Sequence, residues 1–428
     1  MSTTLKFGNG QWATKDGSVL AYNDLNNNYK PLPFDFTRES SATRVNKDGL
    51  IETVGANEPR IDYKDDSKGA LLLEPERTNL IQYSEAFDNA YWTKIGSSVT
   101  SGFISPEGTA NSFKLVENTS TGDHRIDAQG ISTSSGSSYT LSMFLKKTDE
   151  RNWFKLRDFI TNAFINVNLS NGTIGSANLV NNTQKIETFD NNWYRVSFTF
   201  TASSSVALRL YIGESDNNTN YQGDGTSGIY IWGAQLEQGS YATSYIPTSG
   251  STVQRADETA NGSGNSEVFS DSEGVLFAEV SKDKGTQYSL ISLQKSSVSN
   301  TYAYIGYLNN NTTIRGQIKV GGTTVLDEEI EMSDTSIVAK ILIKYKSGDY
   351  SMWVNGFQIG SSTNSTIFSD GDLNEIEFGY NNNSSFRFYG KTKEIAYYDE
   401  ILTDEELEYM TSYRSLNELV TELNLNTL

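Results

Sequence analysis

The segment Phe36–Asn79, FTRESSATRVNKDGLIETVGANEPRIDYKDDSKGALLLEPERTN, sets the organisation of the whole chain. It has no hydrophobic period longer than a few residues and is rich in small, polar and charged residues, so it cannot form a core of its own. Such an extended segment must lie on another surface to offset its ordering entropy. That surface is the neighbouring domain, a sister subunit or a larger particle, and we favour the last two. We therefore expect residues 1–79 to form an extended docking arm, and the side chains expected to anchor it are Trp12, Phe34, Phe36 and Leu72.

Short strings in and beyond this segment are specific. They are SSAT (40–43), DGLIE (48–52), EPRID (58–62), LLLEPERTNL (71–80), SEAF (84–87), YW (91–92) and GAQLEQG (233–239). Together, to about residue 260, they resemble the N-terminal module of bacteriophage head-spike or head-fibre structural proteins, also met in phage tail fibres. The resemblance implies a virion protein assembled in the host cytoplasm, with other capsid or tail proteins as partners. It also implies a symmetric homo-oligomer, most often a trimer.

Composition limits the function further. The 428 residues are too many for one ordinary core, so two or three domains are expected. A formal net charge of −19 argues against a nucleic-acid partner and against an anionic membrane surface, because both require a basic face. No apolar run is long enough to insert into a bilayer, and the N-terminus lacks the apolar core of a signal peptide. Without cysteine, neither disulfides nor thiolate metal sites can stabilise the fold.

Two all-β domains are predicted after the arm. In residues 80–248, apolar and polar residues alternate with period two around 139–146, 194–201 and 206–212, which predicts half-buried antiparallel strands. The order of these strands is similar to jelly-roll, carbohydrate-binding-module-like β-sandwiches. Residues 249–266 have no apolar run and end in a Gly/Ser/Asn cluster, which predicts a linker.

Residues 267–413 carry a second β pattern. Asn355-Gly356 supplies the positive φ angles of a type I′ hairpin turn, and a final aromatic strand precedes the helix start Leu402-Thr-Asp-Glu-Glu406. This order resembles a laminin-G/concanavalin-A-like lectin domain. Thr403 and Glu406 predict a capping box, and residues 414–428 are expected to be a C-terminal helical tail. A four-three spacing of apolar residues there suggests pairing between subunits, or packing on the tail's own domain. The residues of this spacing are Tyr409, Tyr413, Leu416, Val420 and Leu423.

Little in the sequence supports catalysis. His124 is the single histidine, in a polar stretch, so a hydrolytic triad is nearly excluded and a surface loop is the default. Glu375 and Glu377 have the two-residue spacing that some concanavalin-A-like enzymes use for paired acids, but the further acid of those enzymes is absent. We therefore predict no enzyme activity and no cofactor. The turns 216–218 and 370–372 leave a structural calcium ion open, although ordinary Asx turns explain them better.

Sugar recognition requires an exposed aromatic ring beside planar polar groups. Three tyrosines lie next to Asn-rich loops and are the candidate glycan-binding residues: Tyr304, Tyr307 and Tyr380. The sequence thus predicts a non-enzymatic head-fibre or tail-fibre protein whose lectin-like domain adheres weakly and multivalently to host-surface or environmental glycans. The alternatives are capsid decoration without a ligand and a polysaccharide depolymerase.

Overall fold

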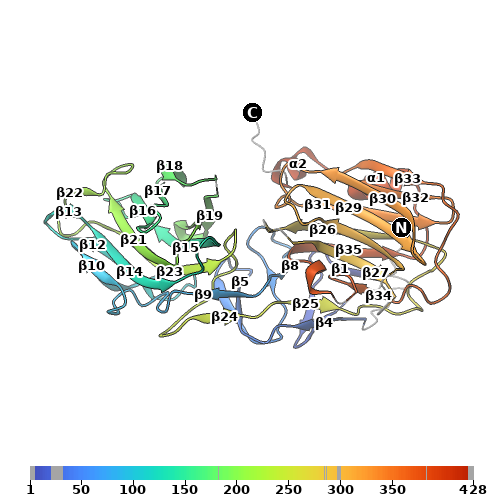
Figure 1. Cartoon of the computed structure of the whole chain (residues 1–428), viewed down its shortest axis with the longest axis horizontal. Helices are drawn as coiled ribbons and strands as arrows, with labels where there is room; N and C mark the ends of the chain where they lie inside the picture. The colour runs from blue at the N-terminus through green and yellow to red at the C-terminus, as the bar shows by residue number, and fades with distance from the viewer. Residues whose placement is uncertain are drawn as a thin grey trace. The chain divides into compact units, whose positions relative to one another are not determined.

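The computed structural model of the protein describes residues 5–20, 32–181, 183–283, 285, 287–295, 300–381 and 383–422. Within these residues the chain is all-β apart from two short α-helices and single 3-10 turns, and it forms two compact units (Figure 1). Unit 1 comprises residues 1–41, 54–75 and 257–428, and unit 2 comprises residues 42–53 and 76–256. The all-β prediction is therefore confirmed.

Unit 2 is a sandwich of two six-stranded antiparallel sheets. One sheet has the order β10 (Thr93–Ile95), β14 (Arg125–Ser132), β21 (Ser205–Gly213), β16 (Trp153–Asp158), β17 (Phe164–Asn168), β18 (Thr173–Asn178). The other has the order β11 (Ser97–Phe103), β12 (Ser112–Glu117), β23 (Gly228–Gln238), β15 (Ser138–Lys146), β20 (Trp193–Thr201), β19 (Lys185–Phe189). The predicted period-two runs are strands β15, β20 and β21, and their inward apolar residues fill the core between the sheets.

A hairpin of residues 42–54 packs on the outer face of the sheet that contains β15, β20 and β23. Strands β5 (Ala42–Val45) and β6 (Ile51–Val54) pair with each other. Val45 and Ile51 pack into a buried cluster that contains Phe144, Trp193 and Trp232. The part of this face that carries Phe144, Trp193 and Trp232 is therefore closed to a ligand. Two short strand pairs complete the unit: β9 (Arg77–Asn79) with β24 (Val253–Arg255), and β13 (Thr121–Asp123) with β22 (Asn220–Gln222).

Unit 1 is a second sandwich with its own core. Its larger sheet has the order β33 (Phe357–Ser362), β32 (Tyr350–Val354), β31 (Ala339–Lys346), β26 (Glu273–Lys282), β35 (Gly390–Tyr398), β8 (Ala70–Leu73), β7 (Ile61–Asp62), and β1 (Leu5–Gly8) also pairs with β35. Its five-stranded sheet has the order β30 (Thr323–Glu331), β29 (Thr313–Val320), β28 (Tyr302–Tyr307), β27 (Ser289–Gln294), β34 (Glu375–Glu377). A small sheet joins β2 (Ala13–Lys15), β3 (Ser18–Leu20), β4 (Phe34–Thr37) and β25 (Thr259–Asn261).

The structure differs from the predicted docking arm. Strands β1, β7 and β8 extend the larger sheet of unit 1, with β1 and β8 both paired to β35, while β2, β3 and β4 form the small sheet with β25. Phe34 and Phe36 are 1% exposed in its core, and Leu72 is 5% exposed. The half-buried Trp12 donates from Nε1 to the Gly69 carbonyl at 3.1 Å. Phe34, Phe36 and Leu72 are buried in unit 1, and Trp12 packs against its core, so these side chains hold the early segment to its own chain.

The predicted linker, residues 249–266, contains the boundary between the units, which falls at Ala256–Asp257. It is not a structureless connection. Strand β24 pairs with β9 within unit 2, and β25 pairs with β4 within unit 1. The weak apolar pattern hid both strands because each is only three residues long.

The hairpin turn and the helix cap predicted near the C-terminus are both present, whereas the apolar residues spaced by four and three, called here the helical seam, do not lie on one helix. Asn355 and Gly356 have φ angles of 49° and 88°, as the hairpin turn requires. Helix α1 (Asp404–Thr411) begins with the capping box of Thr403 and Glu406 and packs on an apolar face of the larger sheet. The seam is broken because α1 ends before α2 (Leu416–Glu422) begins. The last seam residue, Leu423, lies outside the described residues. Neither α1 nor α2 is long and apolar enough to cross a membrane.

Candidate functional site

The outer face of the five-stranded sheet in unit 1 brings several of the candidate residues together. Side chains alternate between the two faces of a strand, so Tyr302 and Tyr304 of β28 point outward while Ala303 and Ile305 point into the core. Tyr307 shares the inward parity and is fully buried, where its hydroxyl donates to the Val280 carbonyl at 2.9 Å. The prediction of Tyr307 as a sugar platform is therefore wrong, and counting parity from Tyr302 could have corrected it.

An aromatic cluster covers the outer face of β27 and β28. The Tyr302 and Tyr304 rings stack with centroids 5.4 Å apart, and the Tyr380 ring meets Tyr302 edge-on at 4.7 Å. Phe386 packs on Tyr380 at 5.6 Å, and Tyr288 packs on Phe386 at 5.1 Å. Tyr302 and Tyr304 are only 5% and 7% exposed, whereas Tyr380 is half-buried. Tyr380 is thus the accessible member of the predicted trio, supported from below by Tyr302.

A chain of polar contacts continues from these rings across the sheet. The Tyr302 hydroxyl donates to Gln317 Oε1 at 2.5 Å, and Gln317 Nε2 donates to Asp327 Oδ2 at 2.8 Å. Arg315 makes a two-pronged contact to the Asp327 carboxylate at 2.7 and 2.6 Å. Burial raises the pKa of Tyr302 to about 12, so its hydroxyl stays protonated and able to donate at neutral pH. The exposed Arg315–Asp327 pair is a planar polar group of the kind that orients sugar hydroxyls.

Glu375 and Glu377 lie on the same outer face, at the edge strand β34. A single amide, Gln294 Nε2, donates to Glu375 Oε1 at 3.1 Å and to Glu377 Oε2 at 2.5 Å. Glu377 is 2% exposed, and Glu375 is half-buried. A glycosidase needs two carboxyl groups that both reach the scissile bond. This arrangement offers a substrate one accessible carboxylate.

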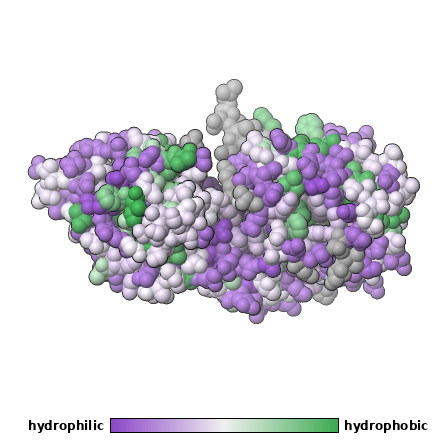
Figure 2. Space-filling view, viewed as in Figure 1, coloured by the Kyte–Doolittle hydropathy of each residue, from purple (hydrophilic) through white to green (hydrophobic). Residues whose placement is uncertain are grey.

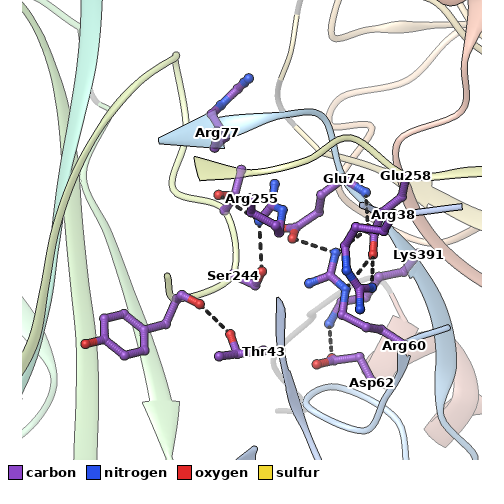
Figure 3. Close-up of polar contacts among 12 residues, drawn as sticks. Arg38, Thr43, Arg60, Asp62, Glu74, Arg77, Ser244, Arg255, Glu258 and Lys391 are labelled. Atoms are coloured by element: carbon purple, nitrogen blue, oxygen red, sulfur yellow. Dashed lines mark hydrogen bonds and ion pairs between the residues drawn. The ribbon is translucent and has the colours of Figure 1, made fainter. Parts of the chain in front are cut away.

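The early segment contributes a buried ionic cluster to unit 1 (Figure 3). Arg38 Nη1 and Arg60 Nε donate to Glu258 Oε1 at 2.7 and 2.8 Å. Arg60 also pairs with Glu74 at 2.9 Å, and the Glu74 backbone N–H donates to Glu258 Oε2 at 2.8 Å. The four side chains are 0–4% exposed. The two guanidinium groups and two carboxylates are buried, so a ligand cannot reach them. They join three segments that are distant in the sequence, around residues 38, 60–74 and 258, and the cluster therefore has a structural role.

Burial disfavours the Arg60 charge, but the charges and hydrogen bonds of Glu258 and Glu74 outweigh that effect and raise its pKa above the ordinary arginine value. Arg60 therefore keeps its positive charge throughout the working pH range. Sequence reasoning recognised the strings that carry Arg38, Arg60 and Glu74, but not their common partner.

The turns considered for calcium are hydrogen-bonded turns. Asp216 accepts from the backbone N–H and hydroxyl of Ser176, and Asp372 accepts from the Ser369 backbone N–H. Within the described ranges, no group of three or more His, Asp or Glu side chains is arranged to hold a metal ion. His124, expected in a surface loop, is instead fully buried in unit 2, with Nδ1 2.6 Å from the Gly96 carbonyl oxygen.

The surface of each unit is mostly hydrophilic, with small separate hydrophobic patches on the face shown in Figure 2. The large apolar side chains with the highest exposure are Phe159, Ile160, Val180, Ile104, Phe357, Tyr409 and Leu416.

No protein-family model and no curated protein matches the chain. Among solved structures, a sialidase CBM40 from Ruminococcus gnavus, bound to α2,3-sialyllactose, matches with 13% identity and a TM-score of 0.29, covering 33% of this chain and 84% of that chain.

Domains LG4-5 of the mouse laminin α1 chain match with 10% identity and a TM-score of 0.24, covering 65% of this chain and 86% of that chain. The CBM22 tandem of Paenibacillus barcinonensis Xyn10C matches with 10% identity and a TM-score of 0.22, covering 74% and 97%. These distant likenesses are to carbohydrate-binding and laminin-G β-sandwiches, and their scores are too low to assign a family.

Proposed function

We propose that this chain is a non-enzymatic adhesion protein that binds glycans through the outer face of the five-stranded sheet in unit 1. The observation that carries the proposal is the half-buried Tyr380 ring, held edge-on by Tyr302, whose hydroxyl leads through Gln317 to the Arg315–Asp327 pair. An aromatic face next to planar polar groups is the usual construction of a sugar site. One such ring gives weak binding, so useful adhesion requires several copies.

We further propose that the copies are displayed on a bacteriophage particle, as a head or tail fibre built from a symmetric oligomer. The support is the sequence resemblance in residues 36–79 and in the string GAQLEQG at 233–239. Immunogold electron microscopy with an antibody against unit 1 tests this display. Label on the capsid or on the tail supports it, and unlabelled particles overturn it.

A glycan array probed with the full-length chain tests binding. We expect Tyr380→Ala to remove the glycan signal while the fold stays intact, because the ring lies at the accessible edge of the cluster. Tyr409→Ala is the matched control, since Tyr409 is 56% exposed on α1, away from this face. If wild-type chain binds no glycan, the protein is decoration without a ligand and the proposal fails.

The depolymerase alternative is tested with Glu375→Gln and Glu377→Gln. We expect no release of reducing ends from any array polysaccharide, either by wild-type protein or by these variants. Release by wild-type protein that both variants abolish would overturn the non-enzymatic assignment.

A further inference from the structure

The outer face of the first sheet of unit 2 carries a row of side chains that the proposed glycan site does not use. Strands β14, β21, β16 and β17 lie side by side in Figure 1, and their register places Asp127 opposite Arg209, Arg209 opposite Arg157, and Arg157 opposite Phe164. Cross-strand partners point to the same face of a sheet. Their sequence neighbours, such as Leu156 and Leu210, fill the core. The row therefore lies on the outer side.

This face is locally positive in a chain of net charge −19. Its cations are Arg125, Lys155, Arg157 and Arg209, and the carboxylates that act on them are Asp123, Asp127 and Asp216. Four cations face three carboxylates. The Arg157 charge also helps to lower the pKa of Lys155, after the larger effect of burial. The cations are thus crowded together on this face.

Arg157 and Arg209 lie nearest the tip of the β16–β17 hairpin, residues 159–163, and both have N–H donors that no carboxylate of the described residues engages closely. Arg125 contacts Asp123 and Asp127 at 2.9 and 3.0 Å, whereas Arg209 approaches Asp127 only to 3.8 Å. Within the described part of the chain, Arg157 makes no ion pair, and its buried Nε has no hydrogen-bond partner. A guanidinium group that no carboxylate engages at hydrogen-bond distance keeps its terminal N–H groups for an anionic ligand.

Both arginines lie over one exposed ring. The guanidinium carbon of Arg209 is 3.4 Å from the Phe159 ring centroid, and that of Arg157 is 5.1 Å away. Phe159 is 45% exposed, and its neighbour Ile160 is 46% exposed. The tip is ordered, because the buried Asp158 carboxylate accepts from the backbone N–H groups of Thr161 and Ala207. The ring and the two cations therefore form a fixed arrangement.

We propose that this face binds an acidic saccharide, with its carboxylate on Arg157 and Arg209 and its pyranose ring against Phe159. A guanidinium fork matches a carboxylate, and an aromatic ring matches the apolar face of a pyranose. Long polyanions such as nucleic acids are disfavoured because the strongly negative chain repels them at distance. A short oligosaccharide with isolated carboxylates meets only the local positive charge.

Isothermal titration calorimetry with the full-length chain tests the proposal. The probes are tetragalacturonate, a hyaluronan tetrasaccharide and an oligomannuronate, each compared with its neutral methyl ester. We expect at least one acid to bind, its ester to bind at least about tenfold more weakly, and its Kd to rise with salt. No binding by any of the three acids, or equal binding of acid and ester, would overturn the proposal.

Variants locate the site. Arg157→Met and Arg209→Met are each expected to weaken binding at least about tenfold, and Phe159→Ala to weaken it severalfold. Lys185→Met removes one positive charge from the opposite sheet of unit 2 and should leave the Kd unchanged. If Arg157→Met does not fold, Arg157→Lys keeps the charge but loses the fork and should still weaken binding. Wild-type affinity in the folded Arg157 and Arg209 variants would contradict the assignment.

This inference is independent of the proposed function because the two sites lie in different units. Tyr380→Ala should leave binding of the acidic saccharide unchanged, and Arg209→Met should leave the unit 1 glycan-array signal unchanged. Failure of one proposal is thereby distinguishable from failure of the other.

Discussion

The buried ionic cluster makes a sharp prediction about how unit 1 is held together. In Arg60→Met, the guanidinium that contacts Glu258 at 2.8 Å and Glu74 at 2.9 Å is lost, and these carboxylates remain in a site of 0–4% exposure. Removing one partner of a buried pair costs about 3–5 kcal/mol, because the remaining charge is left uncompensated. We expect a loss of stability of this size, confined to unit 1.

Hydrogen exchange followed by mass spectrometry resolves the two units. Arg60→Met should lose protection in β4, β8 and β25, while β15, β20 and β23 of unit 2 keep theirs. Arg315→Met is the matched control, since it breaks an ion pair with Asp327 at the surface and should cost no more than about 1 kcal/mol. Protection in unit 1 of Arg60→Met equal to that of wild type would refute the reasoning.

Three further predictions follow from single features. Residues 262–428 expressed alone should fail to fold by circular dichroism, because they lack β1, β4, β7 and β8; a cooperative melt of this fragment would contradict the sheet assignment. Thr403→Ala should destabilise unit 1 by about 1 kcal/mol in urea titration through loss of the capping box, and an unchanged midpoint would count against it. Burial lowers the pKa of Lys282 to about 8, so between pH 8 and 10.5 the unfolded chain binds more protons and stability should rise with pH relative to Lys282→Met; a flat difference between the two proteins would argue against this.

Local signals in the sequence predicted the local structure well. The period-two run at 139–146 is β15, Asn355-Gly356 turns a hairpin, and Thr403 caps α1. Each of these depends on residues close together in the chain, which is why pattern and propensity were enough.

Long-range pairing could not be predicted in the same way. Phe34 and Phe36 alternate with exposed residues in β4, which correctly indicates one buried face, but the sequence does not say which surface covers it. The Phe34 ring packs on Phe378, and the strand that pairs with β4 is β25, more than 200 residues later. The buried charge that binds Arg38 next to this pair is Glu258. A segment that looked like an arm for an external partner therefore belongs to the fold of its own chain.

For the candidate sites, too, the sequence indicated local features but not contacts between distant segments. Tyr380 was predicted because it adjoins an Asn-rich loop, and its role stays a prediction, whereas Tyr307 was misassigned because the parity of β28 was not counted. The Arg157–Phe159 face was missed, although Trp153, Lys155, Arg157 and Phe159 alternate with the core residues Phe154 and Leu156. The binding role proposed for this face depends on Arg209, which lies beside Arg157 only because of the sheet register.

The most direct test of the account is a hydrogen-exchange footprint of the full-length chain with its strongest glycan-array ligand. The account predicts added protection at residues 302–304 and 375–381, with no such protection in Tyr380→Ala. Protection of wild-type chain confined to other segments, or a footprint that Tyr380→Ala leaves unchanged, would contradict a glycan site on this face of unit 1.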